Sequence, residues 1–89
     1  MGLGAGLQLS VFEEKKSMVK YIADFYSAWG VAQKKYPERL ERVTRFSMNN
    51  GYSMRITCDN RMIIQVKESS QKELYEKATA RLNYWLKFH

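Results

Sequence analysis

The sequence predicts an α+β domain of two layers, in which two helices pack on one face of a three-stranded antiparallel sheet, in the order α-β-β-β-α. Three short runs between Val43 and Lys67 are rich in β-branched, aromatic and Met residues, and polar turn sequences separate them. The stretches before and after them have apolar residues at helical spacing. Because sheets and helices each bury one apolar face, these elements fit a two-layer domain.

The first helical stretch ends at Tyr36-Pro37, because the residue before a proline is pushed out of the α region. Its start remains open between two positions. Ser10 opens a capping-box pattern that allows a start near Val11, whereas a shorter helix starts near Ile22.

At 89 residues the chain is long enough for one domain, which we place at residues 18–89. Residues 1–17 are interpreted as an N-terminal leader or extension, either native or artificial. Its first nine residues are rich in glycine, and we expect them to be flexible.

The three runs each have an apolar and a polar face, because successive side chains on a strand point to opposite sides. Asn49-Asn50-Gly51 and Asp59-Asn60 predict the two tight turns between them. The predicted apolar face holds Thr44, Phe46, Met48, Tyr52, Met54, Ile56, Cys58, Met62, Ile64 and Val66. The predicted polar face includes Ile63 and Gln65, and it carries Arg45, Arg55, Arg61 and Lys67 with no acidic residue.

The last stretch predicts a second helix that begins after Ser70. Ser70 and Glu73 form a capping-box pattern. One apolar stripe follows at helical spacing and consists of Leu74, Ala78, Leu82, Trp85 and Leu86. This stripe is expected to pack against the apolar side of the sheet.

The chain is basic, with a formal net charge of +6 and a pI of about 9.6. The charge is concentrated between Lys34 and Lys67, where eight Lys or Arg residues meet three acids. A clustered positive field favours nucleic acid as a partner, although a basic surface also serves solubility alone.

No catalytic or metal-binding constellation is present in the sequence, which predicts a binding module rather than an enzyme, with no cofactor and no small-molecule substrate. The only histidine is His89, which we expect to be exposed. The only cysteine is Cys58, whose strand phase predicts an inert buried thiol and a reducing, cytoplasmic compartment. No stretch approaches the roughly 18 apolar residues of a membrane span.

The basic face suggests contacts with a phosphate backbone. Arg45, Arg55 and Lys67 are expected on adjacent strands, about 5 Å apart in the hydrogen-bonding direction. No aromatic residue is expected on this face, which argues against base stacking and for shape and phosphate contacts to structured RNA. Tyr84, Trp85 and Phe88 are interpreted as core or oligomer contacts.

Several short motifs between about Tyr21 and Leu82 resemble one family. They are Ala23-Asp24-Phe25, Tyr36-Pro37-Glu38, Arg45-Phe46, Asn50-Gly51, Arg55-Ile56-Thr57-Cys58-Asp59 and Lys67. In this order they resemble the smaller Alu-domain subunit of the signal recognition particle (SRP), with one residue inserted before Asp59. Ser47 and Met48 depart from the family pattern, which has a basic residue and a histidine there.

The resemblance implies an RNA-binding subunit of a cytoplasmic ribonucleoprotein. Such a protein forms a heterodimer with the larger Alu-domain subunit, binds SRP RNA, and supports elongation arrest on the ribosome during protein targeting to the endoplasmic reticulum. The resemblance implies RNA contacts for Arg45, Arg55 and Lys67, and for Arg39 after the proline; strand phase adds Arg61.

Two other interpretations remain open. A double-stranded-RNA-binding domain has the same element order, but it places lysines at the start of its second helix, where this chain has Lys72 and then Lys77. The other is a protein-interaction adaptor that binds no nucleic acid and forms a homodimer through a sheet edge or the C-terminal aromatic residues.

Overall fold

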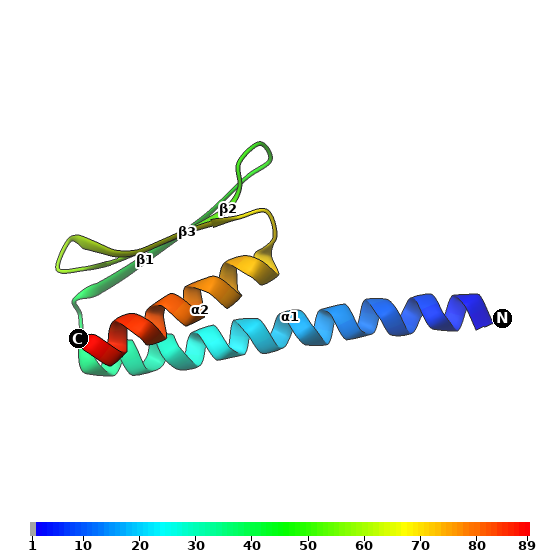
Figure 1. Cartoon of the computed structure of the whole chain (residues 1–89), viewed down its shortest axis with the longest axis horizontal. Helices are drawn as coiled ribbons and strands as arrows, with labels where there is room; N and C mark the ends of the chain where they lie inside the picture. The colour runs from blue at the N-terminus through cyan, green and yellow to red at the C-terminus, as the bar shows by residue number, and fades with distance from the viewer. Residues whose placement is uncertain (1) are drawn as a thin grey trace.

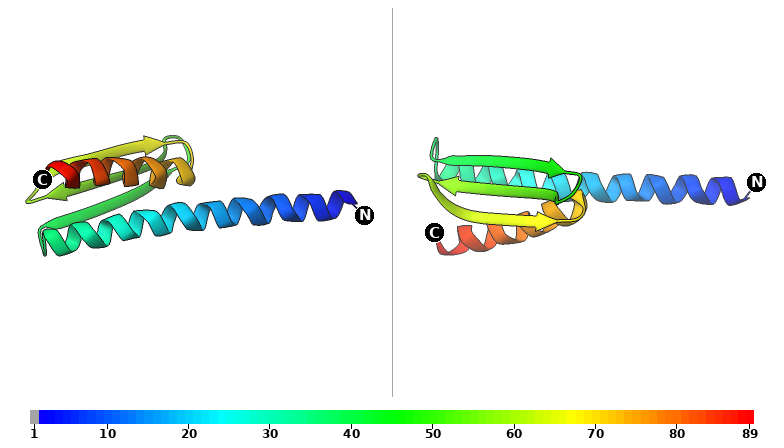
Figure 2. Two further views of the ribbon diagram at one scale, coloured as in Figure 1. Left: turned by 60° about the horizontal axis from the view of Figure 1, so that its bottom comes forward. Right: turned by 90° about the horizontal axis from the view of Figure 1, so that it is seen from above.

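The structure is a computed structural model that describes the backbone of residues 2–89 and the side chains of residues 18–89. It confirms the α+β fold and the predicted order of the elements. The elements are α1 (Gly2–Lys35), β1 (Leu40–Ser47), β2 (Gly51–Cys58), β3 (Arg61–Glu68) and α2 (Gln71–Phe88). The strands form one antiparallel sheet in the order β1-β2-β3, and both helices lie on the same side of it (Figures 1 and 2).

The core lies between the sheet and the helices. Helix α2 packs beneath β2 and β3, and α1 packs along α2. The largest fully buried side chains are Phe25, Met54, Ile56, Leu74 and Leu82. The predicted stripe of α2 therefore faces the core as expected, and Ser70 caps the helix by accepting a hydrogen bond from the backbone N–H of Glu73.

Helix α1 begins at Gly2, before both predicted starts, and extends past the sheet (Figure 1). Ser10 therefore lies inside the helix and does not cap it. Once a helix exists, each added residue gains a hydrogen bond without a new nucleation cost, so the early glycines weaken α1 without ending it. Whether residues 1–17 are a separate leader stays a prediction.

Strand β1 starts earlier than predicted and buries less. It begins at Leu40, three residues before Val43, where the first run was predicted to start. Phe46 pairs with Tyr52 in register, which confirms its predicted strand phase, but its side chain is 61% exposed. Met48 lies in the turn after β1 and is 92% exposed, so its predicted place on the buried face is wrong. The strand phase alone does not show how far the helices extend beneath the sheet.

A register shift in β3 reverses the predicted faces of three residues. Ile56 pairs with Ile64, but the next residue of β2, Thr57, pairs with Met62, so Ile63 is an extra residue. Met62 therefore lies on the open face with Thr57, whereas Ile63 packs against the core cluster. Arg61 pairs with Cys58, which is buried on the helix side, so Arg61 does not share the open face as predicted.

Both predicted turns are present. Asp59 and Asn60 have φ values of 52° and 66°, as a two-residue hairpin with positive φ at both positions requires. Gly51 follows the other turn with a φ of 75°. Asn, Asp and Gly tolerate this left-handed region better than other residues, which is why these short polar sequences could be recognised as turns.

Gly51→Ala is expected to destabilise the domain by about 1–3 kcal/mol. A Cβ on Gly51 would lie 2.7 Å from the carbonyl oxygen of Glu68, and the residue would keep a left-handed φ. Urea unfolding followed by circular dichroism measures the change. Asn49→Ala, in the turn that precedes Gly51, is the control, and an equal effect of the two substitutions would contradict the steric argument.

Candidate nucleic-acid interface

The side of the sheet away from the helices forms an open face, and three cations surround a hollow of about 230 Å³ on it. Arg45 comes from β1, Arg55 from β2 and Lys67 from β3. Ser53 and Gln65 supply polar groups to the same hollow. The structure therefore brings together three of the five predicted RNA contacts.

The register places these three cations in a triangle. Arg45 and Lys67 both pair with Ser53, so they lie in one row on either side of the central strand. Neighbouring strands are about 4.8 Å apart, which puts the two backbone positions roughly 10 Å apart. Arg55 lies two residues further along the central strand, between Val43 and Gln65 in the next row of this face.

The three side chains are exposed, and none of them is in an ion pair with a residue whose side chain the structure describes. Their charges are therefore available to an anionic partner. A multiply charged ligand such as a phosphate backbone suits three cations spread over two rows.

The open face is less uniformly basic than predicted. Because β1 starts at Leu40, it adds Glu41, which pairs with Thr57 on this face. The side chains of Val43 and Met62 are also exposed on it. The expectation that the face has no acid is therefore wrong, and the cations occupy the half of the face nearer the Gly51 end of β2.

Arg39 and Arg61 do not line this hollow. Arg39 donates from Nε to both carboxylate oxygens of Asp59 at 2.9 Å, and its Nη2 also contacts that carboxylate. The guanidinium lies over the ring of Tyr36 as well, at 5.3 Å from its centroid. Arg61 adds positive charge beside Asp59. Arg39 is thus engaged within the protein, at the opposite end of the sheet from the Asn49–Gly51 turn.

The Arg39–Asp59 pair changes the pKa of both groups. The hydrogen bonds from Arg39 lower the pKa of Asp59 below its ordinary value, and the same bonds raise the pKa of Arg39. Both side chains are about half exposed, so solvent screens the interaction. The pair fixes the end of the second hairpin rather than offering a free cation.

Asp59→Asn is expected to reduce stability slightly at neutral pH and to have less effect in acid. Asparagine tolerates the left-handed φ of this position, so the substitution removes the charge and keeps the turn. Because folding lowers the pKa of Asp59, its contribution is present above the ordinary aspartate pKa of about 3.9 and is lost as the pH falls through the lower folded value. Urea unfolding of both proteins at pH 7 and near pH 2.5 measures this; an unchanged difference would contradict the ion pair.

Arg42 has a structural position that the sequence did not reveal. It pairs with Ile56 on the helix side of the sheet. Its guanidinium lies 4.9–5.6 Å from the ring centroids of Phe25, Tyr26 and Trp29, and donates to the hydroxyl of Tyr26 at 3.0 Å. One of the eight clustered basic residues thus anchors β1 to α1 through cation–π contacts. The sequence did not predict this position, because β1 starts at Leu40 and Arg42 lies before the first predicted run.

The lysines at the start of α2 also have partners within the protein. Lys77 forms an ion pair with Glu68 at 2.6 Å, and this hydrogen-bonded carboxylate raises the pKa of Lys77. Lys72 lies over the ring of Tyr21 at 5.3 Å from its centroid. These contacts bear on the double-stranded-RNA-binding alternative, which requires lysines there to be available.

The residues whose side chains are described contain no group of three or more His, Cys, Asp or Glu suited to a metal ion. Cys58 is a free, buried thiol, as predicted. His89 is exposed, also as predicted, and its ring stacks on Trp85.

Over the part of the chain described, the helices lack the length of apolar sequence that a membrane span requires.

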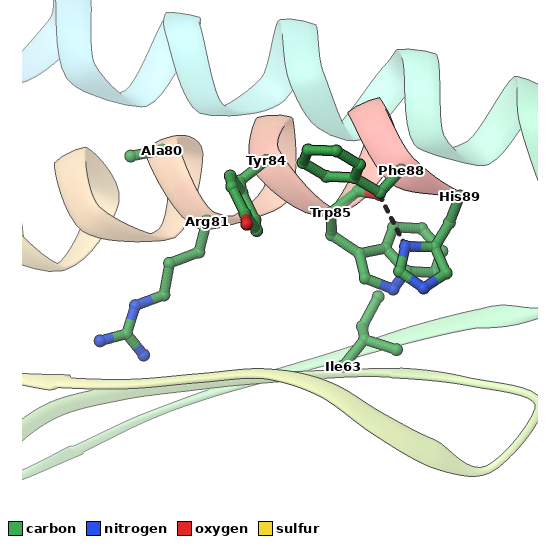
Figure 3. A pocket seen from close by; sticks show the side chains of 7 residues that line it. All are labelled: Ile63, Ala80, Arg81, Tyr84, Trp85, Phe88 and His89. Carbon is green, nitrogen blue, oxygen red and sulfur yellow. Dashed lines mark hydrogen bonds between the residues drawn. The ribbon is translucent and has the colours of Figure 1, made fainter.

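A second hollow, of about 600 Å³, lies between the second half of α2 and strand β3 (Figure 3). Tyr84, Trp85 and Phe88 line it from the helix, and Ile63 lines it from the sheet. Tyr84 is 68% exposed and Phe88 61%, so neither is a core residue. The sequence interpretation missed this groove, because helical spacing alone does not show where a helix leaves the sheet uncovered.

Comparison with models of protein families, with curated proteins and with solved structures finds no match to this chain.

Proposed function

We propose that this chain is a non-enzymatic RNA-binding protein whose open sheet face contacts the sugar-phosphate backbone of structured RNA. One observation carries the proposal. Each of the three strands contributes one exposed cation to the same hollow, and these three cations have no ion-pair partner among the side chains described. A phosphate backbone supplies several negative charges at short intervals, as this arrangement requires.

The composition of the open face favours backbone contacts over base stacking. The residues that surround its hollow are aliphatic, polar or basic, and none of them is aromatic. Ser53 and Gln65 add a hydroxyl and an amide, which suit phosphate oxygens and ribose 2′-hydroxyls. A double-stranded or tightly folded RNA presents such groups without unstacking its bases.

The resemblance described above makes the RNA more specific. On that basis the RNA is the Alu-type RNA of the signal recognition particle, and the partner is the larger Alu-domain subunit in a cytoplasmic heterodimer. Both β1 and β3 are edge strands of the three-stranded sheet, so each has an edge on which a partner's sheet can continue. The combined sheet would extend the basic face and support elongation arrest.

The contacts of α2 argue against the double-stranded-RNA-binding mode. Lys77 is paired with Glu68 and Lys72 lies over Tyr21, so neither is as available as the cations of the open face. Reversing the charge of Lys72 and Lys77 is therefore expected to weaken RNA binding less than reversing Arg45 and Arg55. The opposite order would favour the helix-based mode.

The test is the salt dependence of binding to an SRP Alu-type RNA, measured with and without the larger Alu-domain subunit. Three phosphate contacts predict a slope of about −2 to −3 in a plot of log K against log salt concentration. Arg55→Gln should reduce the slope by about 1 and weaken binding to all RNAs alike. An unrelated stem-loop of equal length is the control for the specific RNA.

Each result has a distinct meaning. Equal binding to both RNAs would support the open face as an RNA site and contradict the SRP assignment. Absence of salt-sensitive binding to any RNA would overturn the proposed function. That result would favour the protein-interaction adaptor, and a search for a protein partner would test it.

A further inference from the structure

The groove between α2 and β3 combines aromatic rings with positive charge. The rings of Tyr84 and Phe88 are one helical turn apart, with centroids separated by 4.9 Å. Trp85 and His89 stack almost in parallel beside them, at 5.0 Å and 12° (Figure 3). Arg81 lines the same groove, and among the side chains described no Asp or Glu lines it.

Arg81 connects this groove to the open face of the sheet. Its Nη1 donates to the backbone carbonyl of Gln65 at 2.7 Å, on edge strand β3. The side chain of Gln65 lies on the other side of the strand and lines the hollow that holds Arg55 and Lys67. One residue of β3 therefore borders both sites, and an extended chain that crosses the β3 edge can reach from one to the other.

The chemistry of the groove fits an unpaired nucleotide. Exposed aromatic faces stack on nucleobases regardless of sequence, and an arginine beside them meets the phosphate or stacks on the base. The volume of about 600 Å³ lies within the range of small-ligand sites. Arg81 uses one of its five N–H donors on Gln65 in the contacts that the structure describes, which leaves donors for a phosphate.

Charge argues against a second copy of the chain in this groove. A symmetric dimer through the groove would bring Arg81 and Lys87 of each copy close to those of the other. Lys87 lies beside the ring of Phe88, at 5.7 Å from its centroid, so this charge is at the rim of the groove. Like charges at a self-contact oppose association, whereas an anionic ligand is attracted.

We propose that the groove formed by Tyr84, Trp85, Phe88, Arg81 and Ile63 is a stacking site for an unpaired nucleobase of single-stranded RNA. The base stacks on the exposed rings, and its phosphate contacts Arg81. The inference rests on the proposed function in one respect, namely that the nucleobase belongs to an RNA. It assigns to this chain a second RNA contact that is based on stacking, next to the phosphate contacts of the open face.

The test uses the full chain and a ten-nucleotide oligouridylate, with binding followed by tryptophan fluorescence. Trp29 is buried in the core and Trp85 lines the groove, so quenching reports mainly on the groove. Phe88→Leu and Tyr84→Leu keep an apolar side chain but remove the π face. Each is expected to weaken binding about 5- to 100-fold. Phe88→Tyr keeps the aromatic ring and should bind as the wild-type chain does.

Two controls separate this site from the open face. Val31→Ala alters an exposed apolar residue on α1, away from the groove, and should leave oligouridylate binding unchanged. Arg45→Glu/Arg55→Glu should reduce oligouridylate binding only a few-fold, while it weakens binding of structured RNA by about 100-fold or more. Loss of structured-RNA binding together with retained, Phe88-dependent oligouridylate binding would therefore establish the two sites as distinct.

The inference fails if the wild-type chain does not quench with oligouridylate, or if Phe88→Leu binds it as well as wild type does. It also fails if sedimentation shows self-association that depends on Phe88, because the groove would then be an interface between copies. None of these results bears on salt-sensitive binding of structured RNA, so the proposed function is tested independently of this inference.

Discussion

Arg45→Glu/Arg55→Glu is expected to weaken binding of structured RNA by about 100-fold or more while the domain stays folded. A hydrogen bond to a charged group contributes about 1.5–3 kcal/mol, so losing two such contacts corresponds to at least two orders of magnitude in Kd. Reversal also places two negative charges against the phosphates. Both side chains are exposed on the open face, so the core is untouched.

The matched control is Lys20→Glu/Lys34→Glu, which changes the net charge by the same amount. Both lysines are exposed on α1, which lies on the other side of the sheet (Figure 2). If binding depends on net charge alone, the two double variants will weaken it equally. That result would contradict the open face as the RNA-binding site. Thermal unfolding of each variant shows whether a loss of binding is a loss of fold.

The element order could be predicted from the sequence because its signals are local. Asn50-Gly51 and Asp59-Asn60 favour positive φ, and Ser70 with Glu73 marks the start of α2. Alternation placed Arg45 and Arg55 correctly on one face of the sheet. These features depend on residues within a few positions of one another, so no knowledge of the packing was needed.

The errors concern features that tertiary structure determines. The extra residue at Ile63 reverses the faces of Arg61 and Met62, and no residue type in that strand signals the shift. Phe46 has the predicted phase but stays largely exposed, because strand phase sets the side of the sheet and not the depth of burial. The engagement of Arg39 by Asp59 also depends on a chain reversal that brings together residues 20 positions apart.

The candidate site was therefore predicted in part. Three of the five predicted cations meet at one hollow, and these are the three that lie within regular strand pairing. Arg61 lies beyond the register shift, and Arg39 precedes β1. The aromatic groove was not predicted, because its exposure depends on how α2 lies against β3 rather than on the spacing of Tyr84 and Phe88.

Ile64→Ala is expected to destabilise the domain by about 2–5 kcal/mol. Its side chain is 3% exposed and belongs to the core cluster, opposite Ile56 in the sheet. Truncation removes buried methyl groups and leaves a cavity among side chains that cannot fully collapse into it. Urea unfolding measures the loss, and a domain of this size has little stability to spare, so the variant should unfold at a much lower urea concentration.

Met62→Ala is the matched control, because strict alternation would place Met62 beside Ile64 on the buried face. The register shift instead places it on the open face, where it is 56% exposed, and its truncation should change stability by no more than about 0.5 kcal/mol. Similar large losses for both variants would show that β3 alternates without interruption. That result would also return Arg61 to the open face, so the pair of variants tests the composition of the candidate RNA site as well as the core.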